Sequence, residues 1–141
     1  LQIRGIGSLI PGVKGMSENI EAISIVDNYL EHMRVFIFGN KGEPDVFISS
    51  ADFMTRNLDG RVEVTCPIYD ADIKKELIDV FNIGWKGNVK ARFHSEKLDN
   101  KYRVRGQNPI FRAQLETYNY YKERCAVSLE EPKVKNEKQS T

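Results

Sequence analysis

Two residues that open an apolar run, His32 and Arg34, have the chemistry needed to handle phosphate. A neutral imidazole can attack phosphorus or take up a proton near its ordinary pKa of about 6.5. A guanidinium group can hold two phosphate oxygens with parallel hydrogen bonds. The pair therefore suits a phosphate site, although a surface histidine near a helix end has the same sequence pattern. The other histidine, His94, is followed by Ser-Glu-Lys and is interpreted as a surface residue.

Arg4 stands in an otherwise apolar stretch, next to Gly5. A buried arginine is costly unless a carboxylate or a ligand anion meets it, and a glycine lets a ligand approach the backbone. The pattern leaves two interpretations open, a structural salt bridge and a phosphate site.

The residues from Ser49 to Glu63 carry hydroxyl, guanidinium and carboxylate groups. Ser50 ends an expected strand, where hydroxyl groups can bind phosphate together with a cation such as Arg61. A capped turn with surface salt bridges is the alternative. Glu63 follows Arg61 by two residues on the same face of an expected strand, and a carboxylate there could orient His32.

The composition indicates one globular domain around these groups. The 141 residues are 40% hydrophobic and 29% charged, with a net charge of +1, so no overall basic field favours nucleic acid. No apolar run reaches the roughly 20 residues of a membrane span. Cys66 and Cys125 lack metal-type spacing, so we expect reduced thiols in a cytoplasmic protein, with peripheral membrane association as the alternative location. The chain opens directly on strand-like residues, Leu1 to Arg4, and we expect that upstream domains are missing from it.

Hydrophobic periodicity predicts an α/β or α+β domain over residues 1–126, with a mixed β-sheet and flanking helices. The expected strands cover 1–10, 21–26, 33–38, 46–49, 61–66, 89–93 and 102–105, and the expected helices cover 70–82 and 112–124. The charged residues 127–141 are expected to form a disordered tail.

Turn and cap residues support this division. Asp70 suits the N-cap of the first helix, residues 39–44 suit a hairpin turn, and Ser17 can cap a short helical turn. Residues 51–59 are expected to be irregular. A helix through Leu30 competes with the strand over 21–26.

Several strings of the chain resemble a known family. The longest is Leu9-Ile10-Pro11-Gly12-Val13-Lys14-Gly15-Met16-Ser17-Glu18-Asn19-Ile20. The shorter ones are Arg4-Gly5-Ile6, Ser24-Ile25-Val26-Asp27, Leu30-Glu31-His32-x-Arg34, Ile48-Ser49-Ser50-Ala51-Asp52, Arg56-Asn57-Leu58-Asp59, Arg61-Val62-Glu63, Asn88-Val89-Lys90-Ala91-Arg92 and Arg112-Ala113-Gln114. Together they resemble the C-terminal catalytic region of the family-one bacterial polyphosphate kinases, over most of residues 1 to about 121. The departures from residues common in that family are Gly7, Ser8, Phe53 and Gly60.

The resemblance implies a phospholipase D-like domain, one of two halves that enclose an active site. Enzymes of this family reversibly transfer the terminal phosphate of ATP to polyphosphate through a phosphohistidine, which here would lie in a missing neighbouring domain. His32 resembles their second histidine, a proton donor or acceptor, and Glu63 resembles its carboxylate partner. The residues expected to bind ATP or phosphate are Arg4, His32, Arg61, Arg34 and Ser50.

The same resemblance implies the partners. ATP or ADP and polyphosphate would be the substrates, and the Mg²⁺ site is expected in the missing domains, with no metal ligand in this chain. The remaining domains of its own chain would dock on an exposed apolar face, and the full-length enzyme would be a homo-oligomer. The isolated domain is expected to be inactive, with no nucleic-acid partner and no membrane span.

Two other functions remain open. The chain has neither a Walker loop nor protein-kinase signatures, which excludes those kinase types. It could instead be half of another phospholipase D-like phosphodiesterase, although Arg34 replaces the lysine of the usual HxK. It could also be a non-catalytic module that binds phosphate or mediates oligomerisation.

Overall fold

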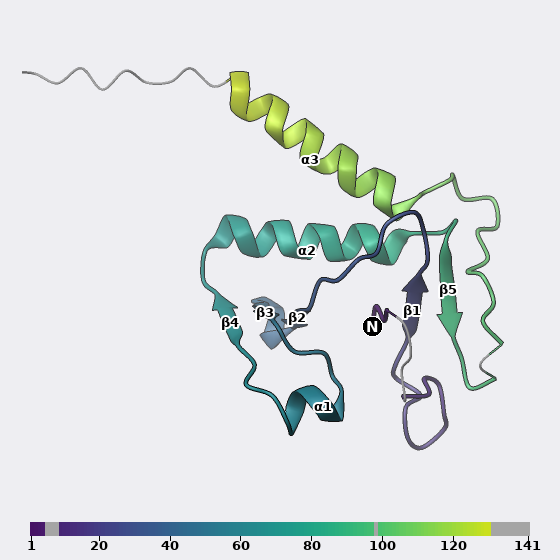
Figure 1. Cartoon of the computed structure of the whole chain (residues 1–141). Coiled ribbons are helices and arrows are strands. Elements are labelled where there is room, and N and C mark those ends of the chain that lie inside the picture. Colours follow the sequence, from purple (N-terminus) through teal and green to yellow (C-terminus); the bar gives the residue numbers. More distant parts are fainter. Residues whose placement is uncertain (5–8, 98, 131–141) are drawn as a thin grey trace, which may run out of the picture.

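The computed structural model describes residues 1–4, 9–97 and 99–130, and Figure 1 shows its elements. The strands are β1 (Ala22–Ile25), β2 (Val35–Phe38), β3 (Asp45–Ser49), β4 (Thr65–Ile68) and β5 (Ala91–His94). The helices are α1 (Thr55–Leu58), α2 (Ala71–Lys86) and α3 (Ala113–Glu130), and a 3-10 turn, η1, covers Asn40–Gly42.

The strands form two small antiparallel sheets, with the orders β1-β5 and β2-β3-β4. The long helix α2 joins them, since it begins after β4 and ends before β5 (Figure 1). The predicted α+β class with flanking helices is confirmed, but two antiparallel sheets replace the expected single mixed sheet. Within the described ranges, parallel pairing is limited to an isolated bridge between Gln2 and Ile23. Short connections such as 39–44 can join only antiparallel neighbours.

The hairpin between β2 and β3 forms where the turn residues predict it. Asn40, Lys41 and Gly42 have φ values of 32°, 56° and 102°, in the left-handed region that glycine and asparagine adopt at least cost. The register pairs Val35 with Ile48. The start of β2 therefore lies beside the end of β3.

The helix α2 begins at its predicted N-cap. The Asp70 carboxylate accepts hydrogen bonds from the backbone N–H groups of Asp72 and Ile73, at 2.9 and 3.0 Å. The helix continues to Lys86, beyond the predicted end at residue 82. Its length carries the chain from one sheet to the other.

The second predicted helix is α3, which packs against α2 (Figure 1). It continues to Glu130, so residues 127–130 are helical where a disordered tail was expected. Residues 131–141 of that expected tail lie outside the described residues. Arg112, just before α3, binds Asp27 after β1 through two hydrogen bonds of 2.6 and 2.8 Å. The pair fixes the start of α3 to the end of β1.

The start of the chain is less regular than predicted. Residues 2 and 23 make an isolated bridge, and 9–10 lie outside any strand, while the remaining part of the expected strand, 5–8, is outside the described residues. Ser17 caps no helix. Its hydroxyl accepts from the Val13 N–H at 3.0 Å and donates to the Ile10 carbonyl at 2.6 Å, which closes a turn. The expected strand over 21–26 is confirmed as β1, so the competing helix does not form.

The second half of the chain also departs from prediction in two places. The strand expected over 61–66 begins only at Thr65, because the Val64 N–H donates to the Ser50 hydroxyl instead of extending the ladder. Residues 101–103 run beside β5 through two backbone hydrogen bonds of 2.9 Å and a bridge at Tyr102. They form only part of the hairpin expected over 89–105.

The core is small and lies mainly around the β1-β5 sheet. Buried apolar residues in the described ranges are Ala22, Ile23, Val46, Val80, Ala91 and Ala113. Four of them belong to β1, β5 and the start of α3. The three-stranded sheet contributes Val46, so its edges are free to carry polar groups. No helix in the described ranges is both long and apolar enough to cross a membrane.

Candidate active site

The strand register brings three separate segments to one edge of the β2-β3-β4 sheet. The Ser49 N–H donates to the Arg34 carbonyl at 2.9 Å, just before β2. The Ser50 N–H donates to the Val64 carbonyl at 3.0 Å, just before β4. Because β2 and β4 both run antiparallel to β3, their starts meet the end of β3, and the side chains of these three segments share that edge.

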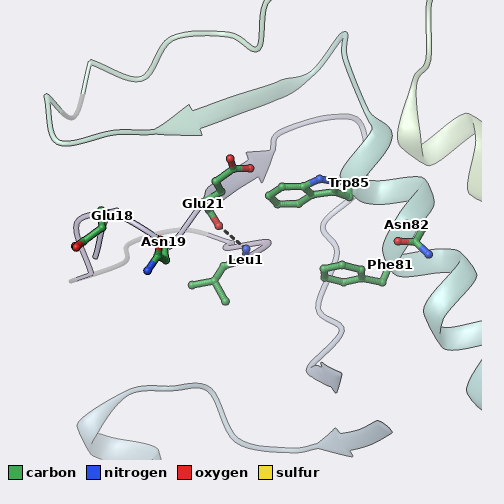
Figure 2. A pocket seen from close by; sticks show the side chains of 7 residues that line it. All are labelled: Leu1, Glu18, Asn19, Glu21, Phe81, Asn82 and Trp85. Atoms are coloured by element: carbon green, nitrogen blue, oxygen red, sulfur yellow. Dashed lines mark hydrogen bonds between the residues drawn. The ribbon is translucent and has the colours of Figure 1, made fainter. Parts of the chain in front are cut away.

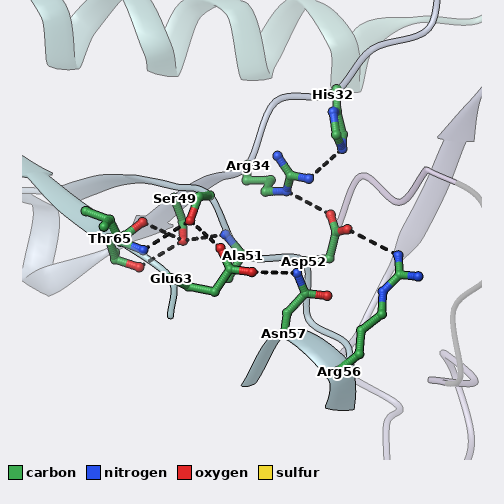
Figure 3. Close-up of polar contacts among 11 residues, drawn as sticks. His32, Arg34, Ser49, Ala51, Asp52, Arg56, Asn57, Glu63 and Thr65 are labelled. Atoms are coloured by element: carbon green, nitrogen blue, oxygen red, sulfur yellow. Dashed lines mark hydrogen bonds and ion pairs between the residues drawn. The ribbon is translucent and has the colours of Figure 1, made fainter. Parts of the chain in front are cut away.

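A chain of two hydrogen-bond contacts and one ion pair runs across this edge from His32 to α1, as Figure 3 shows. The Arg34 Nη2 lies 2.5 Å from the His32 Nε2, and its Nε donates to the Asp52 Oδ1 at 2.8 Å. The other Asp52 oxygen lies 4.0 Å from the Arg56 Nη2. His32 is exposed, so a ligand in solution can reach its ring.

A second polar group lies next to it and is centred on Glu63 (Figure 3). The Glu63 carboxylate accepts one hydrogen bond from the Ser50 hydroxyl and another, of 2.8 Å, from the Asn57 amide. Asn57 is 2% exposed and anchors this carboxylate from α1. Both Glu63 oxygens therefore have donors from within the chain.

The electrostatics of the edge favour ionised carboxylates. The hydrogen bond from Arg34 holds the pKa of Asp52 below its usual range, and the charges of Arg34, His32 and Arg4 act in the same direction. Hydrogen bonds from Ser50 and Asn57, with the charge of Arg61, lower the pKa of Glu63. The bond to Asp52 in turn raises the pKa of Arg34.

Comparison with known proteins agrees with this chemistry. Residues 1–114 match the family model described as "Polyphosphate kinase C-terminal domain 2". The chain belongs to this family. The resemblance noted in the sequence is thereby confirmed.

Curated relatives named polyphosphate kinase share about half of their aligned residues with the chain. The proteins of Escherichia coli (strain K12) and Salmonella typhimurium are 49% and 50% identical over 132 residues, which is 94% of this chain. The crystal structure of the polyphosphate kinase from Porphyromonas gingivalis superposes with a TM-score of 0.76 at 40% identity and covers 79% of this chain. This agreement confirms the phospholipase D-like α+β fold class. The chain spans only 17–18% of the length of these proteins.

The predicted polyphosphate kinase residues gather near this edge, but two of them differ from expectation. Arg4, expected in a buried strand, is exposed, and its charge acts on Asp52. The expected Glu63–His32 pair does not form between these two described side chains. The Glu63 carboxylate accepts hydrogen bonds from Ser50 and Asn57, and the His32 ring contacts Arg34. Arg61 is exposed and its charge acts on Glu63.

Two residues of the site, Asp52 and Asn57, were not predicted. Both occur in strings that carry the family resemblance, but nothing in their local sequence indicates a partner. Asp52 meets Arg34 from 18 positions away, and only the register of β2 against β3 makes that contact possible.

His94 is not the free surface residue that its sequence context suggested. It lies at the end of β5, half-buried, with its Nε2 2.5 Å from the Ser24 hydroxyl. Because β5 pairs with β1, its ring is used to link the two strands.

A hollow of about 620 Å³ lies away from this edge, between the chain start and α2 (Figure 2). Phe81 and Trp85 form one wall, with their rings stacked at 6.4 Å. Glu18 and Glu21 also line it, so it is poorly suited to a polyanion.

Proposed function

We propose that this chain supplies one wall of the active site of an ATP–polyphosphate phosphotransferase, which reversibly moves the terminal phosphate of ATP onto polyphosphate. One observation carries the proposal: an exposed imidazole, in contact with a guanidinium group, stands at a sheet edge where further arginine charges act. The names of the relatives supply the reaction class.

Each side chain has a role that follows from phosphoryl-transfer chemistry. The group in flight spreads negative charge over its oxygens, and fixed cations stabilise that charge. Arg34, Arg4 and Arg61 would serve as these cations. His32 would give or take the proton of the reacting phosphate oxygen. A phosphohistidine in a neighbouring domain would carry the transferred group.

Ser50 and Glu63 would act as a pair. The Ser50 hydroxyl donates to Glu63 and accepts from the Val64 N–H, so its one proton is used inside the chain. When phosphate binds, the hydroxyl would have to exchange Glu63 for a phosphate oxygen. The Glu63 carboxylate, held by Asn57, would then be free to take a new donor, including His32.

The described residues do not by themselves fit a Mg²⁺ site. The described residues contain no cluster of three or more side chains from His, Cys, Asp and Glu that could hold a metal ion. The carboxylates at the edge already bind Arg34, Ser50 and Asn57. We therefore assign any Mg²⁺ that the reaction uses to ligands in other domains.

Exposed apolar side chains near the site suit contact with the remaining domains of the enzyme, in a cytoplasmic homo-oligomer. Those that neighbour the site in sequence, with more than half of their surface exposed, are Tyr29, Leu30, Met33, Phe53, Leu58, Val62 and Val64. A domain docked over them would exclude water from the phosphate site.

The test is His32→Ala in the full-length polyphosphate kinase polypeptide. We expect ATP-dependent polyphosphate synthesis to fall by about 10²-fold or more, the range for loss of a general acid–base group. His94→Gln, which alters the other histidine, is the matched control and should keep most of the activity. Near-normal synthesis by His32→Ala would instead favour a non-catalytic module, and cleavage of a chromogenic phosphodiester would favour a phosphodiesterase.

A further inference from the structure

The contact between Arg34 and His32 determines which nitrogen of the imidazole carries its proton. A guanidinium group has only N–H donors and accepts no hydrogen bond. The Arg34 Nη2, 2.5 Å from the His32 Nε2, must therefore donate, and Nε2 must carry a lone pair. In the neutral ring the proton then sits on Nδ1.

The other histidine has the opposite arrangement. The Ser24 hydroxyl donates its one proton to the Ile3 carbonyl at 2.7 Å. Toward the His94 Nε2, at 2.5 Å, it can therefore only accept. His94 thus carries its proton on Nε2, and the two histidines of the chain differ in tautomer.

We propose that Asp52 is a positioning residue, which holds Arg34 so that its Nη2 covers the His32 Nε2 and fixes the ring as the Nδ1–H tautomer. The use of this arrangement in phosphate transfer rests on the proposed function. In the resting site, His32 can donate from Nδ1 to a phosphate oxygen. Its basic nitrogen becomes available only when a phosphate draws the Arg34 Nη2 away.

Asp52 is the residue placed to do this. It binds the Arg34 Nε, which leaves the outer nitrogens of the guanidinium free to point to His32. The cationic and titratable groups around its carboxylate are Arg34, Arg56, Arg4 and His32. Glu63 does not bind Arg34 in this structure: its oxygens accept from Ser50 and Asn57, and only its charge acts on Arg34. Without the carboxylate, the exposed His32 ring would be the remaining described hydrogen-bond partner of the Arg34 side chain.

The experiment is a two-bond ¹H–¹⁵N correlation spectrum of the imidazole rings in the ¹⁵N-labelled chain, at a pH of about 8, where an ordinary imidazole is neutral. The unaltered chain should show Nδ1–H for His32 and Nε2–H for His94. Asp52→Asn should shift the His32 tautomer ratio about tenfold toward Nε2–H, equivalent to about 1.4 kcal/mol, and leave His94 unchanged. Asp59→Asn, which alters an exposed carboxylate at the end of α1, should change neither ring.

Arg34→Met provides a second route if Asp52→Asn does not fold, because it removes the donor and leaves the carboxylate. It should produce the same shift. An unchanged His32 ratio in a folded variant, or Nε2–H on His32 in the unaltered chain, would overturn the proposal.

Kinetics separate this inference from the proposed function. In the full-length polyphosphate kinase, Asp52→Asn should lower kcat about tenfold with little change in the KM for ATP. If His32→Ala keeps full activity while the tautomer shift is observed, the catalytic function fails and the positioning of the ring stands. If His32→Ala is inactive and the His32 tautomer ratio does not change in Asp52→Asn, the catalytic function stands and the positioning of the ring by Asp52 fails.

Discussion

Two hydrogen-bonded Arg–Asp pairs of the described residues use the same groups in different ways. Arg112 gives both Nε and Nη2 to one carboxylate, that of Asp27, and the side chains of this pair are 36% and 1% exposed. Arg34 gives only Nε to Asp52 and turns Nη2 to His32, and the side chains of this pair are 21% and 29% exposed. Arg112 thus uses two nitrogens on one carboxylate, whereas Arg34 uses one nitrogen on its carboxylate and has Nη2 available for another group.

The difference lies in the surroundings. The Arg112 pair joins the end of β1 to the start of α3, next to buried Ala113, where an unpaired charge would be costly. The Arg34 pair lies at the open edge of the β2-β3-β4 sheet, where water can replace a lost partner. We infer that the pair built on the buried Asp27 carboxylate stabilises the fold and that the pair at the sheet edge is available for ligand binding.

The largest expected effect is a loss of activity when Arg34 is removed, and it distinguishes Arg34 from Arg112. Under the proposed function, Arg34→Ala in the full-length polypeptide should lower polyphosphate synthesis by about 10²-fold or more, because a fixed cation would be lost from the transition state. The midpoint of urea unfolding of the chain should stay unchanged. Arg112→Ala, the matched variant, should instead lower that midpoint. Equal losses of activity and stability in both variants would contradict the division.

The next effect is on stability and compares the two aspartates. Asp27→Asn should lower the free energy of unfolding by about 2 kcal/mol, since charge-assisted hydrogen bonds are lost at a buried position. Urea titration followed by circular dichroism measures the change. Asp52→Asn should leave the unfolding midpoint in place. A larger loss for Asp52→Asn than for Asp27→Asn would show that the exposed edge, and not the α3 junction, holds the fold.

The smallest effect is a pH dependence of stability, which comes from the Asp27–Arg112 pair. The hydrogen bonds from Arg112 lower the pKa of Asp27, so its contribution to stability is fully present above the ordinary carboxyl pKa of about 3.9. It is lost as the pH falls through the lower pKa of the folded state. Unfolding midpoints measured from pH 7 down to about pH 3 should therefore drop at the acid end. In Asp27→Asn this drop should be shallower, and an identical drop in both chains would exclude the pair as its cause.

Local sequence predicted the features that depend on near neighbours. The Asp70 cap needs only the N–H groups two and three residues away, and the turn at 39–44 needs only its own glycine and asparagine residues. Both were predicted correctly. The strand over 61–66 was misplaced, because a hydroxyl from another segment takes the Val64 N–H.

The sequence by itself determined the family, the α+β class and most of the residues that gather at the sheet edge. Strings of residue types carry this information without reference to contacts. The partners of those residues were decided only by tertiary structure: Asp52 for Arg34, Asn57 for Glu63, and Asp27 for Arg112 across 85 positions. Side-chain hydrogen bonds require atoms within about 3 Å, and only strand register and helix docking bring distant segments that close.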